Sequence, residues 1–276
     1  MQILTPSEIA DFTVNAGIKK AGLTPAKQFL LGIMAGAFIA FGAQAANVVT
    51  HTISDVGTAK LISGLIFPAG LMLVLMAGAE LFTGNSLMIL ALLERKITLA
   101  KLLRSWLVVY LGNLAGGVLV AYLICWSGQL NYTGGLLGGI TLKSAAGKIS
   151  LTFIQALVLG VLCNWLVCLA VLTSFGAKDA IGKAVCVFFP VWVFVASGFE
   201  HSIANMYYIT AGILAKSSPQ FVAKALEAGA SQSAIDALNW CSMFTGNLVP
   251  VTLGNIIGGS VFVGVVYWFV YLNGNR

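Results

Sequence analysis

The chain has 276 residues, of which 59% are hydrophobic and only 9% charged, whereas an ordinary soluble domain has about 25% charged residues. So little charge excludes a nucleic-acid binder, a secreted disulfide scaffold and a cytosolic enzyme. The net charge of +6 is therefore interpreted as membrane topology and not as the footprint of an acidic ligand.

Residues 1–26 lack the basic start and apolar run of a signal peptide. Residues 5–8 (TPSE) form a capping box with proline at the first helical position, and Ile9, Phe12 and Ala16 then share one helical face. We expect residues 1–26 to form a cytoplasmic amphipathic helix lying at the membrane interface. The alternative is a movable plug at a cytoplasmic pore mouth.

Uncharged stretches long enough to cross a bilayer follow along the chain, since a spanning helix takes about 20 apolar residues. They are residues 28–54, 61–79, 105–142, 149–177 and 237–275. A sixth hydrophobic stretch, residues 184–215, contains the single charge of Glu200, and the second stretch continues past Glu80. The pattern predicts six spans within one transmembrane domain, residues 27–272.

If six spans alternate sides, ten of the 15 basic residues lie on one side of the membrane and five on the other. By the positive-inside rule, both termini are expected in the cytoplasm. The five cysteines lie in apolar stretches without a metal-ligand spacing, so we expect buried small hydrophobic side chains, no metal and no cofactor.

Two motifs occur twice. Residues 78–89 and 198–209 share the pattern G-x-E-x-x-x-x-N-x-x-x-I, and LGNLAGG at 111–117 recurs as LGNIIGG at 253–259. Each half of the chain then contains three helices, the second of them broken. Because three is odd, the second half must enter the membrane from the opposite side.

The predicted fold is therefore an all-α membrane protein of six transmembrane helices in a 3+3 inverted repeat, with helices 2 and 5 broken. The first repeat covers about residues 27–128 and the second about 147–272. Such repeats place the permeation site at the bilayer midplane, between the broken helices.

The breaks contain the repeated acidic residues Glu80 and Glu200. Backbone groups exposed by a break cost several kcal/mol each in hydrocarbon. We expect the two carboxylates to accept hydrogen bonds from loop amides, and we favour this structural capping over direct substrate contact. The repeated asparagines Asn85 and Asn205 are expected to support the same loops.

His201 lies inside the second break, where a neutral imidazole can both donate and accept a hydrogen bond. A core histidine is the alternative, but the position favours a pore role. Thr83 offers a hydroxyl from the first break. Large apolar neighbours would form narrow slits or plain packing, and Lys148 either snorkels to the interface or draws anions toward an outer vestibule.

Residues 77–84 (AGAELFTG), 160–170 (GVLCNWLVCLA), 197–206 (SGFEHSIANM) and 251–259 (VTLGNIIGG) strongly resemble the formate/nitrite transporter family, within a match from about residue 27 to 272. This family includes formate, nitrite and hydrosulfide channels. The resemblance implies an aquaporin-like protomer, a homopentamer with a separate pore in each subunit, and a bacterial cytoplasmic membrane.

By motif match, His201 would be the central pore histidine, Thr83 the threonine facing it, and Asn164 an asparagine near the pore. Lys148 would be the lysine of the outer vestibule, and the amino-terminal helix a cytoplasmic gate. The constrictions would be formed by Phe67, Leu71, Leu81, Phe82 and Phe194.

The expected function is a pore for small monovalent anions, namely formate, hydrosulfide or nitrite, with proton exchange at His201 easing passage through the apolar slits. A neutral-solute channel for water or ammonia is the alternative. A non-transporting membrane protein would leave two broken helices unexplained. A membrane enzyme is disfavoured because Glu80, Glu200 and His201 are the only ionisable groups expected at mid-membrane depth.

Overall fold

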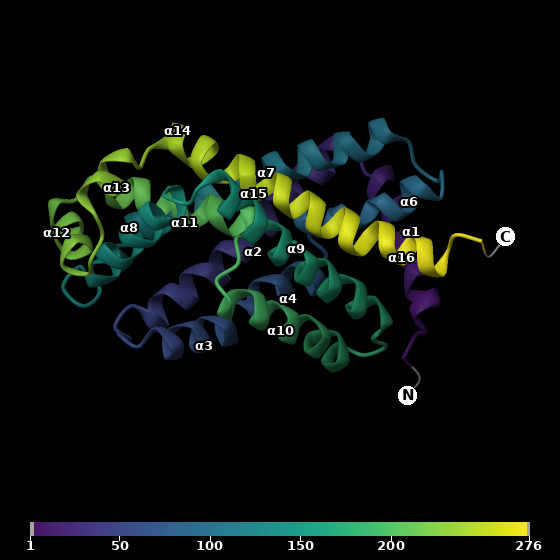
Figure 1. Ribbon diagram of the computed structural model, residues 1–276, viewed down its shortest axis with the longest axis horizontal. Coiled ribbons are helices and arrows are strands. Elements are labelled where there is room, and N and C mark those ends of the chain that lie inside the picture. Colours follow the sequence, from purple (N-terminus) through teal and green to yellow (C-terminus); the bar gives the residue numbers. More distant parts are fainter. Residues whose placement is uncertain (1–2, 275–276) are drawn as a thin grey trace.

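The computed structural model describes residues 3–274, and these are all-helical, without a strand (Figure 1). The first part of the chain forms α1 (Pro6–Gly22), α2 (Pro25–Thr50), α3 (Val56–Ile66), α4 (Pro68–Ala77), α5 (Phe82–Asn85), η1 (Ser86–Met88), α6 (Ile89–Leu93), α7 (Leu99–Trp126), η2 (Gln129–Asn131) and α8 (Leu136–Ile149). The second part forms α9 (Phe153–Gly176), α10 (Ala180–Ala196), α11 (Ser202–Ala215), α12 (Pro219–Glu227), α13 (Gln232–Ala237), α14 (Trp240–Ser242), η3 (Met243–Leu248), α15 (Val249–Ile256), η4 (Ile257–Val265) and α16 (Val266–Tyr271).

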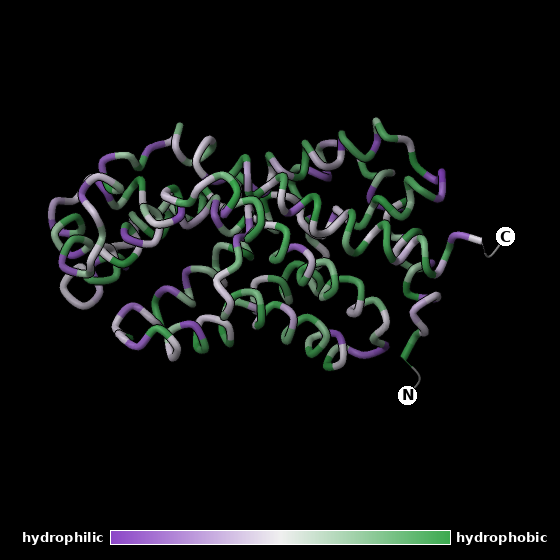
Figure 2. The backbone as a smooth tube through the Cα atoms, viewed as in Figure 1, coloured by the Kyte–Doolittle hydropathy of each residue, from purple (hydrophilic) through white to green (hydrophobic). Residues whose placement is uncertain are grey.

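Five helical stretches of the described chain are long and apolar enough to cross a membrane, and hydrophobic residues run along them in Figure 2. They are Pro25–Thr50, Val56–Ala77, Leu99–Trp126, Phe153–Gly176 and Trp240–Tyr271. The expected sixth stretch is divided, because α10 ends at Ala196 after 17 residues and α11 begins only at Ser202.

Close helix pairs depend on glycine. A Cβ atom on Gly116 of α7 would overlap the carbonyl oxygen of Ile33 in α2, and one on Gly258 would overlap the carbonyl oxygen of Val161 in α9. Without side chains there, the backbones approach directly, as is common between membrane helices. The LGNxxGG repeats therefore hold α7 against α2 and the last long helix against α9.

Helix α1 begins as predicted, with Thr5 and Glu8 forming a capping box. It packs against α6 and α9. On the face that packs against the protein, Thr13 is buried with its hydroxyl donating to the Ile9 carbonyl, whereas Phe12 is 47% exposed.

The cysteines are only partly as expected. Cys163 and Cys168 are fully buried and behave as small core residues. Cys125 and Cys186 are partly exposed, and Cys241 is exposed near the start of the last long helix, so burial does not extend to all five.

The molecule has two distinct ends. Figure 1 shows α8, α12 and α13 together at one end, with both chain termini at the opposite end. Helix α8 was not expected from the uncharged stretch 105–142, which the structure divides at Ser127 and Gly128. Between these ends, the broken helix α4–α5 and the broken helix α10–α11 approach each other.

Candidate permeation site

The two helix breaks have the same backbone construction. After α4, Gly78 adopts a left-handed conformation with φ of 82°, and after α10, Gly198 does so with φ of 72°. In both, the next amide donates back to the helix, from Ala79 to the Val74 carbonyl and from Phe199 to the Phe194 carbonyl. Glycine is favoured there because a Cβ penalises this conformation.

Two buried asparagines outside the breaks satisfy the loop backbones. In the first break, the Asn113 side chain accepts from the Phe82 amide at 2.9 Å and donates to the Glu80 carbonyl at 2.9 Å. In the second, Asn255 accepts from the Ser202 amide at 2.9 Å and donates to the Glu200 carbonyl at 3.0 Å. These side chains supply the partners that the interrupted helices lack.

The carboxylates accept from side chains, so the expectation that they accept from loop amides is wrong. Glu80 accepts from the Lys20 ammonium at 2.7 Å and from the Asn85 amide at 2.8 Å. Its own amide donates to the Leu31 carbonyl of α2, at 3.2 Å. Through the contact with Lys20, Glu80 ties α1 to the first break.

Glu200 has the equivalent set of partners. It accepts from the Lys148 ammonium at 2.7 Å and from Asn205 at 2.6 Å, with Asn247 as a third donor at 3.2 Å. Its own amide donates to the Leu159 carbonyl of α9, at 3.3 Å. In each half, the acid and the asparagine of the repeated motif therefore contact each other, and a lysine from another helix pairs with the acid.

His201 and Thr83 meet across the two breaks. His201 Nε2 lies 2.9 Å from the Thr83 hydroxyl, and the two residues are 3% and 0% exposed. His201 also caps α11, since its Nδ1 accepts from the Ala204 amide at 3.1 Å. Because Nδ1 is an acceptor, the proton of the neutral ring is assigned to Nε2, which points at Thr83.

Asn164 supports the first break. Its amide nitrogen contacts the Thr83 carbonyl and the Ser86 hydroxyl, both at 3.2 Å, and the Asn255 carbonyl at 2.6 Å. It is fully buried and lines neither of the cavities described next. The geometry thus gives Asn164 a part in positioning Thr83.

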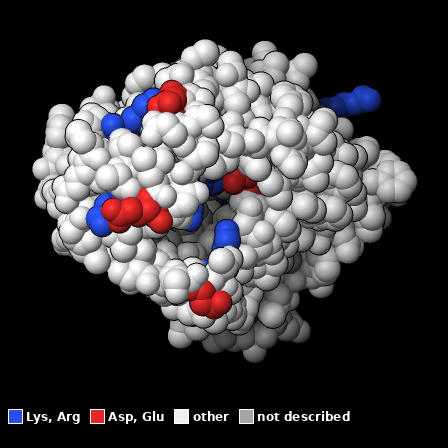
Figure 3. All heavy atoms as spheres, turned by 60° about the vertical axis from the view of Figure 1, so that its left-hand side comes forward, with Lys and Arg blue, Asp and Glu red and all other residues white. Residues whose placement is uncertain are grey.

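Two cavities approach the Thr83–His201 pair from opposite ends. The wide cavity, of about 800 Å³, reaches Phe67, Phe194 and His201 from the α8 end. Figure 3 shows this end hollowed, with basic side chains in and around the hollow. The narrow cavity, of about 180 Å³, reaches Leu71 and Leu81 from the α1 end.

A thin apolar septum separates the cavities. Phe67 and Leu71 lie one helical turn apart, about 6 Å along the axis, yet the first lines the wide cavity and the second the narrow one. Phe67 packs edge-on against Phe194, whose ring stacks 6.0 Å from that of His201. Phe82 differs, because it lines neither cavity and packs against Trp106 and Tyr110 of α7.

Lys148 lies in the last turn of α8, and not at the start of the following span, because α8 ends at Ile149 and Thr152 caps α9. It lines the wide cavity while paired with Glu200, and its ammonium lies 5.4 Å from the centre of the Tyr208 ring. Neither snorkelling nor a free cation describes this arrangement.

Sequence reasoning missed four residues of this site: Lys20, Asn113, Asn247 and Asn255. The LGNxxGG repeat contains Asn113 and Asn255, but it was interpreted only as an internal repeat. No local pattern marks Lys20, whose partner lies 60 residues away in the sequence. Asn247 ends a second copy of the tetrapeptide FTGN, residues 82–85 and 244–247, and this repeat is a signal that could have found it. Among the described residues, no three His, Cys, Asp or Glu side chains gather as a metal site would require.

Comparisons with known proteins agree on one family. A family model described as formate/nitrite transporter matches residues 7–269. The formate channel FocA of Escherichia coli K12 is 41% identical over 278 residues, covering 99% of this chain and 96% of that protein. A probable formate transporter of Methanothermobacter thermautotrophicus is 40% identical over 264 residues, covering 89% of each chain.

A solved structure is equally similar. The structure titled pentameric formate channel with formate bound has a TM-score of 0.79 and 40% sequence identity, covering 90% of this chain and 98% of that one. All three similar proteins are named as channels or transporters, and none as an enzyme, in agreement with the expectation of transport.

Proposed function

Because this chain belongs to the formate/nitrite transporter family, we propose that this multi-pass membrane protein is a pore that conducts formate. The observation that carries the proposal is the Thr83–His201 contact, which lies in an apolar septum between two cavities open toward opposite ends. Polar groups at that depth are costly and mark permeation paths in membrane proteins.

The path begins in the wide cavity, crosses the ring pair Phe67 and Phe194, and reaches the Nε2–H of His201. This N–H and the Thr83 hydroxyl replace water around the anion at the septum. Leu71 and Leu81 then form the second slit before the narrow cavity, with Phe82 packed behind them. Asn164 and the two glutamate clusters hold the loops in place.

Proton exchange with His201 is part of the proposal. An apolar slit penalises a bare charge, and a proton shared with the imidazole reduces that charge at the septum. Nδ1 stays unprotonated as the acceptor of the Ala204 amide, so the shared proton is the one on Nε2, and it returns to the ring when the anion leaves. Each anion that crosses therefore moves one net negative charge across the membrane.

We further propose the 3+3 inverted repeat of six spans, with an aquaporin-like arrangement. The support is the equivalence of the two breaks: Asn113 contacts the carbonyls of Gly32 and Glu80, as Asn255 contacts those of Gly160 and Glu200. By similarity to the pentameric relative, the working unit is a homopentamer with a pore in each subunit.

The distribution of basic residues supports an orientation with both termini in the cytoplasm. The similarity to the Escherichia coli relative supports a bacterial cytoplasmic membrane as the location. The narrow cavity then faces the cytoplasm. Thr13, Ala16, Gly17 and Lys20 of α1 form part of its wall, so α1 covers the cytoplasmic mouth in this structure. This geometry favours the plug over the interfacial helix as the role of residues 1–26.

The test is flux into proteoliposomes that contain purified protein, with formate, hydrosulfide and nitrite compared at several pH values. We expect formate flux well above that of protein-free vesicles, and hydrosulfide and nitrite to share the path, since each has one charge and small size. Ammonia or water flux without any anion flux would favour the neutral-solute channel. No flux at all would overturn the proposal.

A further inference from the structure

The wide cavity contains a second lysine without a counterpart in the narrow one. Its charged lining residues are Lys60, Lys143, Lys148 and Glu200, whereas the narrow cavity has only the pair of Lys20 and Glu80. The wide cavity therefore has an excess of two positive charges, and the narrow cavity has none. A cleft of one sign concentrates counter-ions and speeds their entry.

The excess charge does not come from Lys148, because Glu200 compensates it at 2.7 Å. Lys143 donates to the Ala228 carbonyl at 2.6 Å, away from the septum. Lys60, in α3, is exposed to the cavity and has neither an ion pair nor a hydrogen bond from its ammonium among residues 3–274. Its charge is therefore available to a ligand.

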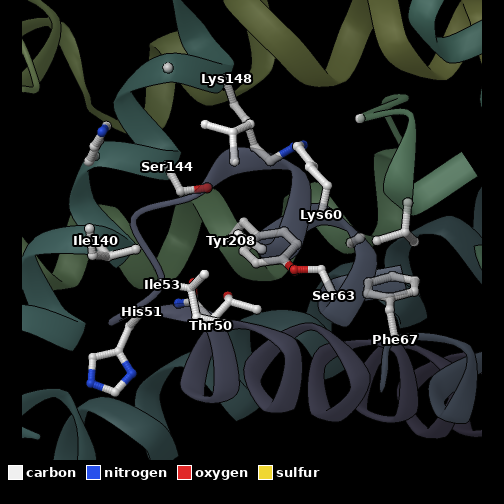
Figure 4. A pocket seen from close by; sticks show the side chains of 18 of the residues that line it. Thr50, His51, Ile53, Lys60, Ser63, Phe67, Ile140, Ser144, Lys148 and Tyr208 are labelled. Atoms are coloured by element: carbon white, nitrogen blue, oxygen red, sulfur yellow. The ribbon is translucent and has the colours of Figure 1, made fainter. Parts of the chain in front are cut away.

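The position of Lys60 directs that charge toward the septum. A Cβ on Gly198 would lie 3.0 Å from the Lys60 nitrogen, so the ammonium lies against the break two residues before Glu200. Figure 4 shows Lys60 and Lys148 reaching into the cavity from different helices, with Ser63 one turn below Lys60 and Ser144 on the facing wall. The hydroxyls of both serines have no partner among the hydrogen bonds of the described residues.

We propose that Lys60, with the Ser63 and Ser144 hydroxyls, forms a binding site for a small monovalent carboxylate or similar anion in the wide cavity. The ammonium neutralises the anion, the hydroxyls donate to it, and Lys148 adds a compensated charge beside them. The site captures anions ahead of the Phe67–Phe194 slit. This inference rests on the proposed anion conduction and assigns its entry step.

The first test is formate flux in proteoliposomes as a function of formate concentration. Lys60→Gln should raise the half-saturating concentration about tenfold and leave the maximal rate within about twofold, while Lys60→Arg should resemble the unaltered protein. The matched control is Lys224→Gln, which removes a lysine from the same end but from an exposed pair with Glu227 outside the cavity. It should change neither quantity.

The second test restores the charge within one folded variant. Lys60→Cys should reproduce the defect, 2-aminoethyl methanethiosulfonate should reverse it, and the sulfonatoethyl reagent should worsen it; protein with Lys60 intact is treated in parallel because Cys241 is exposed. A fall in maximal rate alone, or no response to the sign of the reagent, would overturn the entry site. Absence of formate flux in the unaltered protein would instead overturn the proposed function.

Discussion

His201 uses one ring nitrogen for the fold and offers the other to the pore. Nδ1 accepts from the Ala204 amide at the start of α11, and this fixes the Nε2–H toward Thr83. The cap therefore determines which ring nitrogen carries the proton and where that proton points.

Replacing His201 separates these two uses. His201→Asn keeps a side-chain acceptor for the Ala204 amide, so the melting temperature should stay close to that of the unaltered protein. It removes the titratable donor, and formate flux should fall about tenfold and lose its pH dependence. Flux is measured in proteoliposomes across pH, and an unchanged rate with an unchanged pH profile would refute the pore role.

The Lys20–Glu80 pair predicts a stability effect. Lys20→Met leaves the Glu80 carboxylate, 7% exposed, without its cation, and should destabilise the protein by about 3 kcal/mol. The double variant Lys20→Met with Glu80→Gln should recover much of that loss. Thermal unfolding in detergent measures both.

The matched control for this cycle is Lys224→Met, which breaks a pair whose side chains are 36% and 63% exposed. It should cost less than about 1 kcal/mol. If Lys20→Met proved no more harmful than Lys224→Met, the Lys20–Glu80 pair would not be the tie between α1 and the first break.

At the scale of elements, local chemistry predicted where helices begin better than which face they bury. The capping box of α1 was visible in residues 5–8, because cap and partner are three residues apart. The face that α1 buries was not visible in the sequence. The Thr13 hydroxyl donates to a carbonyl of the same helix, so this polar residue can be buried, and Gly17 lets α6 approach closely because it has no side chain. Such contacts depend on a partner that the sequence does not identify.

The packing of α1 can be tested at Gly17. A Cβ there would lie 2.9 Å from the Ala91 Cβ, so Gly17→Val should displace α1 and increase trypsin cleavage at Lys19 and Lys20 about tenfold. Gly22→Val is the control, because a Cβ at Gly22 meets nothing within 4 Å. Equal cleavage of both variants in detergent would show that α1 is not held by this contact.

The helix breaks show the same limit of prediction. The repeated G-x-E motif located both breaks, and His201 with Thr83 beside them. The side chains that satisfy the loops, Asn113 and Asn255, come from other helices, so only a three-dimensional arrangement connects them to the breaks. The uncharged stretch 105–142 likewise did not indicate where α7 ends, because the turn at Gly128, with φ of 77°, lies inside it.

At the scale of the whole molecule, hydropathy predicted a multi-pass chain, because an uncharged apolar stretch of about 20 residues is long enough to cross a bilayer as a helix. Hydropathy could not predict the end formed by α8, α12 and α13. At this end α12 and α13 pack on α8, and α8 packs on α11. Of these helices, α8 forms one wall of the wide cavity, and the charge excess of this cavity makes the two mouths of the molecule unequal.

The proposed assembly is also a whole-molecule prediction. In mild detergent, light scattering should give a protein mass close to five times the 28.9 kDa of one chain. Flux in proteoliposomes should persist in each assembly in which one subunit is blocked, because each subunit has its own path. A monomer that conducts formate as well as the larger species would contradict the homopentamer as the working unit.

The most direct test of formate conduction is the reversal potential across a bilayer that contains the purified protein. If formate crosses as an anion through the His201 septum, the potential should follow the formate gradient, by about 59 mV per tenfold ratio at 25 °C. His201→Asn should reduce the current. A current that ignores the formate gradient, or no current while neutral solutes cross freely, would contradict the account.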